Sequence, residues 1–513
     1  MIDDLRRLTD GADLETDVCV VGAGAAGIAL AREFLDSGTR VIVLESGGLR
    51  SSRTADSLNE GEATGMDAAS LTEGRERVLG GATALWAGQC LPPEPNSFEP
   101  RDWVPNSGWP FDERELEPYY RRAEALFQIE GEVYDERVWD AFDVERPAID
   151  PARFVHRFTV WCPQPHLGRL YRKRLEASRN VRVLLDATAT KILATGDRFE
   201  AVTARGPDGE TVRVRARACV VAGGAVENAR LLLASGLGNE VVGRYFQDHP
   251  NGHCAVVASP DPARLQELYG LLYRGRIRYL PRLVLTPEAQ RAERVLSCAA
   301  YPVFHFGEKS AIEASRRVYR ALRGGRRPEA LGRELGLMAR GAPRLAPVAY
   351  RRLVHRRAAQ VRPERVTLQT HAEQAPNPDS RVTLSERRDR FDEPLPKVDW
   401  RLTELDRRTA EVMVESVAAE FRRLGLGDVR AEPWLAGPDW NGHLRDAFHH
   451  IGTTRMGTDP GTSATDPNGQ VRGVSGLFAA GASVFPAAGY VNPTLGLAAL
   501  AIRLGDHLKS TLA

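Results

Sequence analysis

Two short segments near the end of the chain hold residue types that suit acid–base chemistry. A histidine pair, His449 and His450, opens the segment HHIGTTRMG, and Asn492-Pro493 opens the apolar segment NPTLGLAALAI. A neutral histidine has an ordinary pKa of about 6.5 and can accept a proton at neutral pH, so we assign the base to His449. Asparagine suits the N-cap of a helix and proline its first turn. We therefore expect a helix to begin there and to direct its positive dipole end towards an anion.

Such chemistry needs an element that holds a cofactor, and the start of the chain predicts one. Residues 16–48 read as a strand, a glycine-rich turn, a helix and a second strand, with Gly22, Gly24 and Gly27 in the spacing G-x-G-x-x-G. Gly22 would form the turn, Gly24 would let the backbone approach a pyrophosphate, and Gly27 would let the helix pack on the strand. Glu45 ends the second strand, where it would accept from ribose hydroxyls. The pattern predicts dinucleotide binding; a tight turn without a ligand is the alternative.

Four segments together resemble the glucose-methanol-choline (GMC) flavoprotein oxidoreductases. They are HHIGTTRMG, NPTL, RVLGGATALWAGQ at 77–89 and ACVVAGGAVENARLLLAS at 218–235. Within that family the chain is most similar to the bacterial pyranose, sugar and glycoside oxidases and dehydrogenases, with pyranose oxidase itself a more distant relative. The resemblance extends over almost the whole chain. It implies FAD as the cofactor, because the segments at 77–89 and 218–235 match those that run along the flavin ring and complete the FAD domain.

The resemblance also implies the residues of the site. His449 lies four residues before Thr453, as the catalytic histidine of the family does, and Asn492 occupies the family's second catalytic position. A catalytic His450, a purely structural histidine pair and a simple N-cap at Asn492 are the alternatives. Gln374 and His450 are weaker candidates for substrate contact, and no metal site is expected. The implied cofactor-binding residues are Gly22, Gly24, Ala25, Ala26, Gly27, Glu45, Ser46, Gly80, Gly81, Thr83, Trp86, Ala87, Gly88, Ala189, Ala222, Gly223, Gly481, Ala482, Asn492, Pro493 and Thr494.

The flavin loop at 77–89 carries two further expectations. Gly80, Gly81 and Gly88 should let its backbone lie close to a flat ligand, although a merely structural turn would show the same pattern. In pyranose oxidase a histidine just before the tryptophan of this loop is covalently linked to the flavin, and here that position is Leu85. Leucine has no nucleophilic atom, so we expect non-covalent FAD.

A length of 513 residues predicts two domains or two interleaved ones. The resemblance implies an α/β plus α+β fold. In it a Rossmann-type FAD-binding domain, of the GMC and p-hydroxybenzoate hydroxylase type, is interleaved with an antiparallel-sheet substrate domain. We place the FAD-binding domain at 1–100, 165–250 and 440–513, and the substrate-binding domain at 101–164 and 251–439. Asp248 and His249 lie where the chain crosses between them, and for both we favour hydrogen bonding at the junction over catalysis.

Residues 308–365 differ from the rest of the chain in charge. They hold sixteen Lys or Arg and five Glu, with arginine pairs at 316–317, 326–327, 351–352 and 356–357. The spacing favours two or three short basic helices. A solvated helical arm is the simplest interpretation, and a lid over the cavity or a basic docking face for a partner or an anionic substrate are the alternatives.

The implied function is FAD-dependent oxidation of a CH–OH group to a carbonyl on a sugar, a glycoside or a similarly polar alcohol, with hydride passing to flavin N5. A hydroxyl on a natural-product scaffold or an aliphatic alcohol is the alternative substrate. A non-redox flavin-dependent lyase is the alternative of another class. The sequence does not decide between oxygen, a quinone and another carrier as electron acceptor, and it does not give the oligomeric state.

Composition gives no sign of nucleic-acid binding, a membrane span or a disulfide framework. Basic and acidic residues nearly balance, 69 against 68, which gives no reason to expect nucleic-acid binding. No run reaches the roughly 20 apolar residues of a membrane span, and the six scattered cysteines fit reduced thiols. We therefore expect a cytoplasmic protein without a membrane span.

Overall fold

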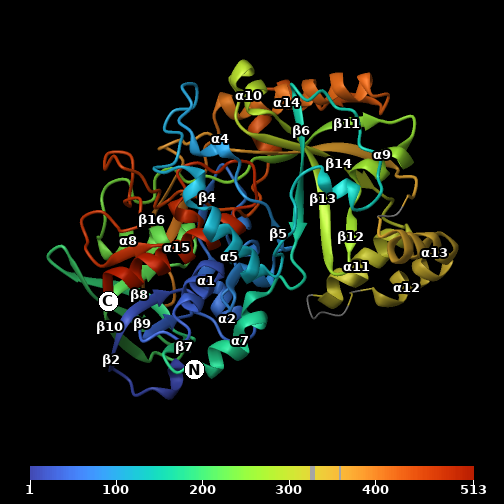
Figure 1. The fold of residues 1–513 in the computed structure, drawn as a ribbon. Coiled ribbons are helices and arrows are strands. Elements are labelled where there is room, and N and C mark those ends of the chain that lie inside the picture. Colours follow the sequence, from blue (N-terminus) through green and yellow to red (C-terminus); the bar gives the residue numbers. More distant parts are fainter. Residues whose placement is uncertain (324–327, 329, 358–359, 513) are drawn as a thin grey trace.

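The computed structural model describes residues 1–323, 328, 330–357 and 360–512, and in it two large sheets form two lobes (Figure 1). The sheet of the lobe that carries both termini is built mainly from parallel strands, in the order β1-β7-β3-β2-β10-β9-β8, with β19 paired to β10. Only β9 and β8 join it antiparallel. Its strands are β1 (Ile2–Asp4), β2 (Ala12–Val21), β3 (Val41–Leu44), β7 (Val181–Leu185), β8 (Thr188–Thr195), β9 (Arg198–Arg205), β10 (Thr211–Val221) and β19 (Leu477–Ala479).

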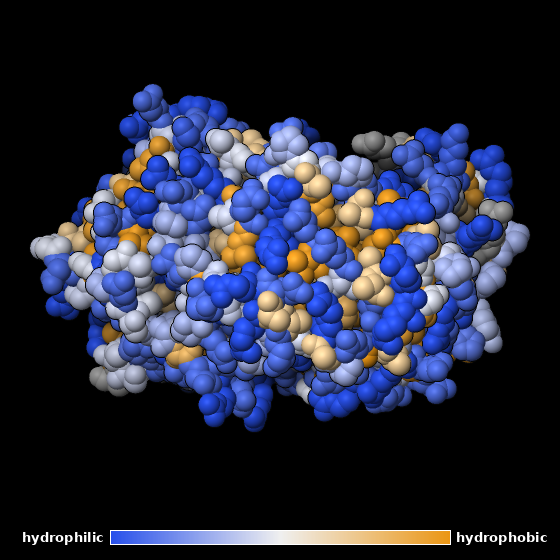
Figure 2. Space-filling view, turned by 90° about the horizontal axis from the view of Figure 1, so that it is seen from above, coloured by the Kyte–Doolittle hydropathy of each residue, from blue (hydrophilic) through white to orange (hydrophobic). Residues whose placement is uncertain are grey.

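The second large sheet is antiparallel and forms the other lobe. Its order is β18-β11-β15-β14-β13-β6-β5, with β12 paired to β13. Helix α14 (Glu404–Arg423) packs across β11, β14 and β15 on one face of this sheet. Seen from the side of α10 and α14, the surface is mostly hydrophilic, with hydrophobic residues in small groups between charged ones (Figure 2). The strands are β5 (Gln89–Cys90), β6 (Phe154–Trp161), β11 (Asn251–Ala258), β12 (Leu272–Arg274), β13 (Ile277–Leu285), β14 (Cys298–His305), β15 (Arg365–Ala372) and β18 (Asp428–Ala431).

The two sheets confirm the predicted fold class, a Rossmann-type α/β part interleaved with an antiparallel sheet. Strand β2 enters the glycine-rich turn and helix α1, and β3 then pairs in parallel with β2, so that Cys19 lies beside Ile42. The end of β2 is apolar and buried on both faces, as parallel strands covered by helices are. A third, small sheet of β16 (Arg381–Arg388), β17 (Pro394–Asp399) and β4 (Glu62–Thr64) packs against α8.

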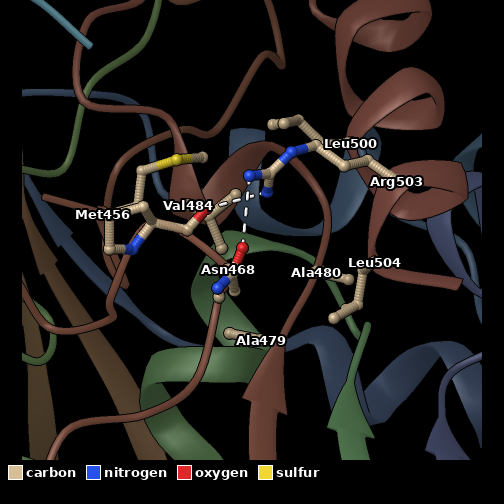
Figure 3. A pocket seen from close by; sticks show the side chains of 10 residues that line it. Met456, Asn468, Ala479, Ala480, Val484, Leu500, Arg503 and Leu504 are labelled. Carbon is tan, nitrogen blue, oxygen red and sulfur yellow. Dashed lines mark hydrogen bonds between the residues drawn. The ribbon is translucent and has the colours of Figure 1, made fainter. Parts of the chain in front are cut away.

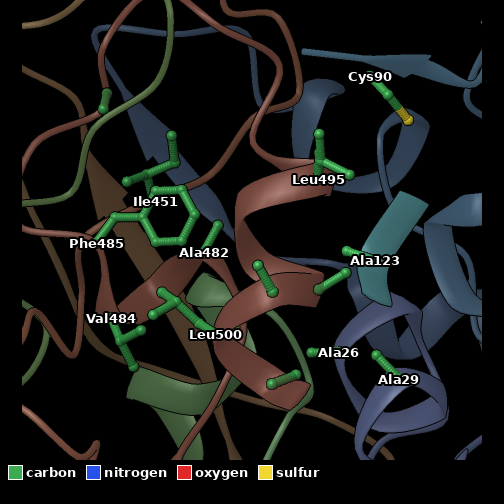
Figure 4. Close-up of a cluster of buried hydrophobic side chains, with 14 of the residues drawn as sticks. Ala26, Ala29, Cys90, Ala123, Ile451, Ala482, Val484, Phe485, Leu495 and Leu500 are labelled. Carbon is green, nitrogen blue, oxygen red and sulfur yellow. The ribbon is translucent and has the colours of Figure 1, made fainter. Parts of the chain in front are cut away.

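The C-terminal helix ties the histidine segment to the dinucleotide turn. Helix α15 starts at Thr494, two residues after Asn492, which agrees with the predicted start to within one turn. It packs against α1 and α5. Figure 4 shows Ala29 of α1 and Ala123 of α5 on one side of α15, and Leu500 of α15 on the other side, beside Val484. The small side chains on α1 and α5 allow this close packing.

The other helices connect and cover the sheets. The longer ones are α1 (Ala25–Glu33), α5 (Glu117–Phe127), α7 (Leu167–Ala177), α8 (Ala225–Ser235), α9 (Pro262–Tyr269), α10 (Pro287–Glu293) and α15 (Thr494–Leu512). The short ones are α2 (Arg53–Asp56), α3 (Ser70–Glu73), α4 (Pro95–Phe98) and α6 (Arg137–Asp140). Among the described helices none is long and apolar enough to cross a membrane.

The basic segment forms a helical arm near the β12 end of the antiparallel sheet (Figure 1). It contains α11 (Ala311–Arg323), α12 (Leu331–Arg340), α13 (Ala342–Tyr350) and a π-helical turn at Arg351–His355, which agrees with the two or three basic helices predicted. The arginine pair at 326–327 lies outside the described residues. Large apolar side chains of the arm are exposed, among them Leu322 at 64% and Leu353 at 79%.

Candidate active site

The glycines of the turn after β2 have three different physical roles. Gly22 has φ +103°, and a Cβ there would lie 2.8 Å from the carbonyl oxygen of Ala222. A Cβ at Gly27 would lie 1.9 Å from the carbonyl oxygen of Gly22, so this glycine lets α1 pack on the turn. At Gly24, where φ is −76°, no protein atom lies within 4 Å of the Cβ position. Protein packing does not require a glycine there, and the open space fits a ligand that approaches the backbone closely.

A cavity of about 650 Å³ is lined both by this turn and by the histidine segment. It brings together His449, the predicted base, and most of the predicted cofactor residues, although these come from the two ends and the middle of the chain. Of the predicted residues the following line it: Gly22, Gly24, Ala25, Ala26, Glu45, Ser46, Gly81, Thr83, Trp86, Ala87, Ala189, Ala222, Gly223, His449, His450, Gly481, Ala482, Asn492, Pro493 and Thr494.

Glu45 has the position expected of a ribose ligand. One of its carboxylate oxygens accepts from the N–H of Ala23 at 2.8 Å and the other from the N–H of Gly47 at 2.9 Å. Each oxygen keeps a lone pair for a further donor. Burial raises the pKa of Glu45 to about 7, so a donor that enters the cavity would favour the ionised form.

Two glycines of the loop at 77–89, Gly80 and Gly88, are needed for packing within the protein, which corrects their predicted role beside a flat ligand. A Cβ at Gly80 would lie 2.8 Å from a backbone nitrogen of α7, and one at Gly88 would lie 2.8 Å from the sulfur of Cys162. Both have positive φ, and neither lines the cavity. Gly81 does line it, but a Cβ there would meet the Cα of Gly24 at 2.9 Å. Gly27 is likewise absent from the lining, because it faces the turn.

His449 is held at both ring nitrogens. Its Nε2 lies 3.2 Å from Nδ2 of Asn492, and its Nδ1 lies 3.0 Å from Nδ1 of His249. Arg282 donates to Oδ1 of Asn492 over a long 3.5 Å, so the amide directs its N–H groups towards His449. In the tautomer that satisfies these contacts, Nε2 of His449 accepts and Nδ1 donates to His249. The Asn492 side chain is therefore used in the site, and the simple N-cap alternative does not describe it.

The electrostatic surroundings keep these histidines neutral. Burial lowers the pKa of His449 well below its ordinary value, and the neighbouring His249 and Arg282 lower it further. Burial also lowers the pKa of His249 and of His450 to about 3. His371, stacked on His249 at 4.6 Å, has its pKa lowered for the same reason. A neutral imidazole is the form that can accept a proton.

A buried carboxylate fixes the backbone of the histidine segment. Asp248 accepts from the backbone N–H groups of His249 at 2.6 Å, Ala447 at 2.9 Å and His449 at 2.9 Å. It does not line the cavity. This agrees with the junction hydrogen bonding expected of Asp248. His249 also makes a hydrogen bond that was not expected, to the ring of His449.

Gln374 does not lie where a substrate contact would. Its side chain is fully buried and accepts from the backbone N–H of Asp248 at 2.9 Å and from Nε1 of Trp400 at 2.7 Å. It is absent from the cavity lining, so the predicted substrate contact is corrected to a structural role beneath Asp248. His450 does line the cavity, and its Nε2 lies 3.9 Å from Asp248.

Five cavity residues from the antiparallel sheet were missed. They are Gln89 on β5, Asn251 on β11, Arg282 on β13, Tyr301 on β14 and His371 on β15. Their neighbours in space come from strands far apart in the sequence. The only local signal was Arg282, a charge inside the apolar run LPRLVL of a strand.

A second pocket beneath α15 does not compete with this cavity. It measures about 20 Å³ and is lined by residues such as Met456, Asn468 and Arg503 (Figure 3). Arg503 donates to the Pro467 carbonyl at 2.9 Å and to Oδ1 of Asn468 at 3.2 Å. The space is of the order of one water molecule, too small for a substrate.

Comparison with known proteins identifies the family. The N-terminal model of the GMC oxidoreductases matches residues 172–251, and the C-terminal model matches residues 376–501, which include His449 and Asn492. The chain is a GMC oxidoreductase. An uncharacterised GMC-type oxidoreductase of Mycobacterium tuberculosis (strain ATCC 25618 / H37Rv) is 27% identical over 96% of this chain and 75% of its own. A C-glycoside 3-oxidase of Microbacterium trichothecenolyticum is 26% identical over 85% of this chain and 75% of its own.

Solved structures agree on the fold. The crystal structure of pyridoxine 4-oxidase from Mesorbium loti has a TM-score of 0.58 with 16% identity, over 96% of this chain and 99% of that one. As a GMC oxidoreductase the protein is a flavoenzyme that acts on CH–OH groups, with FAD as its cofactor. The residues present fit FAD: Gly24 leaves space that a pyrophosphate could fill, and Glu45 has lone pairs for ribose hydroxyls. The loop residues Gly81 to Thr83 and Leu85 to Ala87 line the cavity between the two lobes.

Proposed function

We propose that this GMC oxidoreductase oxidises a hydroxyl of a sugar, a glycoside or a similarly polar alcohol, with His449 as the general base. The observation that carries the proposal is the pairing of His449 Nε2 with Asn492 Nδ2 at 3.2 Å in the wall of the FAD cavity. A substrate hydroxyl would replace the direct contact between the two side chains. It would donate its proton to Nε2 of His449 and accept from the Asn492 amide.

The chain's own residues divide the chemistry between them. Bound FAD supplies the acceptor for the hydride that leaves the carbinol carbon. His449 takes the hydroxyl proton on Nε2, and Asn492 holds the oxygen while negative charge develops on it. His249 accepts from Nδ1 of His449 and so keeps the ring in the tautomer whose Nε2 carries no proton and can take one. Asp248 holds the backbone of His449 in place.

Two further features support the proposal. The wall opposite the nucleotide turn is polar, with Gln89, Asn251, Arg282 and Tyr301 in the lining, which suits a substrate with several hydroxyls. The similarity to a C-glycoside 3-oxidase points to the same substrate class. Non-covalent FAD is part of the proposal, since Leu85 lines the cavity and offers no atom for a bond to the flavin.

Anaerobic flavin reduction across a panel of sugars, glycosides and aliphatic alcohols tests the proposal. We expect loss of the yellow colour with at least one sugar or glycoside. Reduction by aliphatic alcohols alone would contradict the sugar assignment. A folded, FAD-loaded protein that no alcohol reduces, but that cleaves one, would instead favour the lyase alternative.

A further inference from the structure

Arg282 is a buried cation whose donors are not all used. Its side chain projects from β13 into the cavity wall and is 2% exposed. One terminal nitrogen, Nη2, donates to Oε1 of Gln89 at 2.8 Å and, over 3.5 Å, to Oδ1 of Asn492. The N–H groups on Nε and Nη1 are buried, and among the described residues they have no hydrogen-bond partner.

The surroundings of Arg282 supply no negative charge. Its guanidinium lies 5.2 Å from the ring centre of Tyr301. The titratable groups that interact electrostatically with it are two tyrosines and three histidines: Tyr301, Tyr490, His249, His371 and His449. Across the described residues no Asp or Glu forms an ion pair with it.

Two of the three other buried arginines pair with an acid, whereas the third, Arg455, also has unpartnered donors but does not line the cavity. Arg101 forms a two-pronged contact with the buried Glu373, at 2.6 and 2.8 Å, and Arg230 pairs with the buried Asp389 at 2.6 Å. A guanidinium does not lose its proton in a protein, so burying one without a partner is costly. Arg282 is left without an acid in the part of the cavity where the substrate hydroxyl would sit.

We propose that Arg282 binds an oxyanion on the substrate, so that the enzyme oxidises an alcohol that also carries a carboxylate, such as an acidic sugar. The inference rests on the proposed function, because it takes the hydroxyl to be held by His449 and Asn492. Arg282 lies within 3.5 Å of Asn492, so the carboxylate and the reacting hydroxyl are only a few bonds apart. The same charge excludes an ammonium group from that position.

Three matched substrates test the proposal: methyl glucoside, its uronic acid and its amino-sugar analogue. We expect the unchanged enzyme to have a higher kcat/KM for the acid than for the neutral glucoside, and a lower one for the amine. Arg282→Met should reduce the acid-to-neutral ratio about 10- to 100-fold, mainly through KM, the loss of one hydrogen bond to a charged group. Arg282→Lys should restore part of it. Arg276→Met, which removes an exposed arginine from the turn before β13, is the control for loss of charge alone.

The results separate this proposal from the function on which it rests. No preference for the acid by the unchanged enzyme would overturn the proposal while leaving alcohol oxidation intact. An equal loss of rate on all three substrates in Arg282→Met, with a lowered flavin reduction potential, would also overturn it and would place Arg282 with the flavin. No flavin reduction by any alcohol would refute the proposed function instead. If Arg282→Met does not fold, competitive inhibition of the unchanged enzyme by tetrahydropyran-2-carboxylate, a ring acid with no hydroxyl to oxidise, supports the proposal, and equal inhibition by its methyl ester overturns it.

Discussion

Replacing His449 by alanine should slow flavin reduction sharply while leaving the protein folded and yellow. The change removes the ring that would accept the substrate proton, and a positioned general base contributes about 10²- to 10⁴-fold in rate, or about 3 to 5 kcal/mol of barrier. The fold loses the side-chain contacts to His249 and Asn492, each of roughly 1 kcal/mol, and the edge contact of the ring with His371. The backbone contact of residue 449 to Asp248 is unchanged.

The measurement is the rate of anaerobic flavin reduction at saturating substrate, with bound FAD determined from absorbance in the same sample. His450→Ala is the matched control, because that residue is adjacent, buried and also on the cavity, yet has no contact with Asn492 in the structure. It should lose much less activity than His449→Ala. A larger loss in His450→Ala, or a His449→Ala enzyme that reduces its flavin at the original rate, would refute the assignment of the base.

Three further outcomes follow from the geometry. Gly24→Ala should change the unfolding free energy of the FAD-free protein by no more than about 0.5 kcal/mol but should weaken FAD binding about tenfold or more. Gly27→Ala should instead destabilise the fold itself. If both variants had equal effects on FAD affinity and on stability, the result would contradict the open space seen at Gly24. Asn492→Asp places an anion beside His449, which favours the protonated imidazole and raises the pKa of His449. The acid limb of the kcat/KM profile should therefore move to higher pH. An unmoved limb would show that another group is titrating. Acid precipitation should release yellow FAD into the filtrate because Leu85 cannot form a covalent bond, and colour that stays with the precipitate would reveal a linkage elsewhere.

Local spacing predicted the features that depend on neighbours in the sequence. The positive φ of Gly22 and the close packing at Gly27 agree with the turn and packing roles predicted, and the open space at Gly24 is compatible with the ligand approach that stays a prediction. The start of α15 depends on the Asn-Pro pair alone, and it lies within a turn of the prediction. The pairing of His449 with Asn492 came from the family resemblance, since no local pattern brings residues 43 positions apart together.

The missed residues line the cavity because of the order of strands in the antiparallel sheet. Arg282, Tyr301 and His371 line the cavity because β13, β14 and β15 are neighbours in one sheet, and strand order is not readable from a single strand. The prediction that Gln374 contacts the substrate was wrong for a related reason. It lies just past the end of β15, where one step along the chain decides between the cavity and the protein interior.

The helical arm makes this nearly neutral molecule strongly dipolar. The arm, residues 308–365, carries sixteen basic and five acidic residues, so the remainder of the chain holds 53 basic and 63 acidic ones. The arm thus has a formal charge of +11 and the remainder one of −10. Opposite charges held apart in one body experience a torque in an electric field that is not aligned with their dipole, even when the net force is small. Near a negatively charged surface the protein should therefore orient with its arm facing that surface. A cation-exchange resin should retain it even at a pH where its total charge is zero.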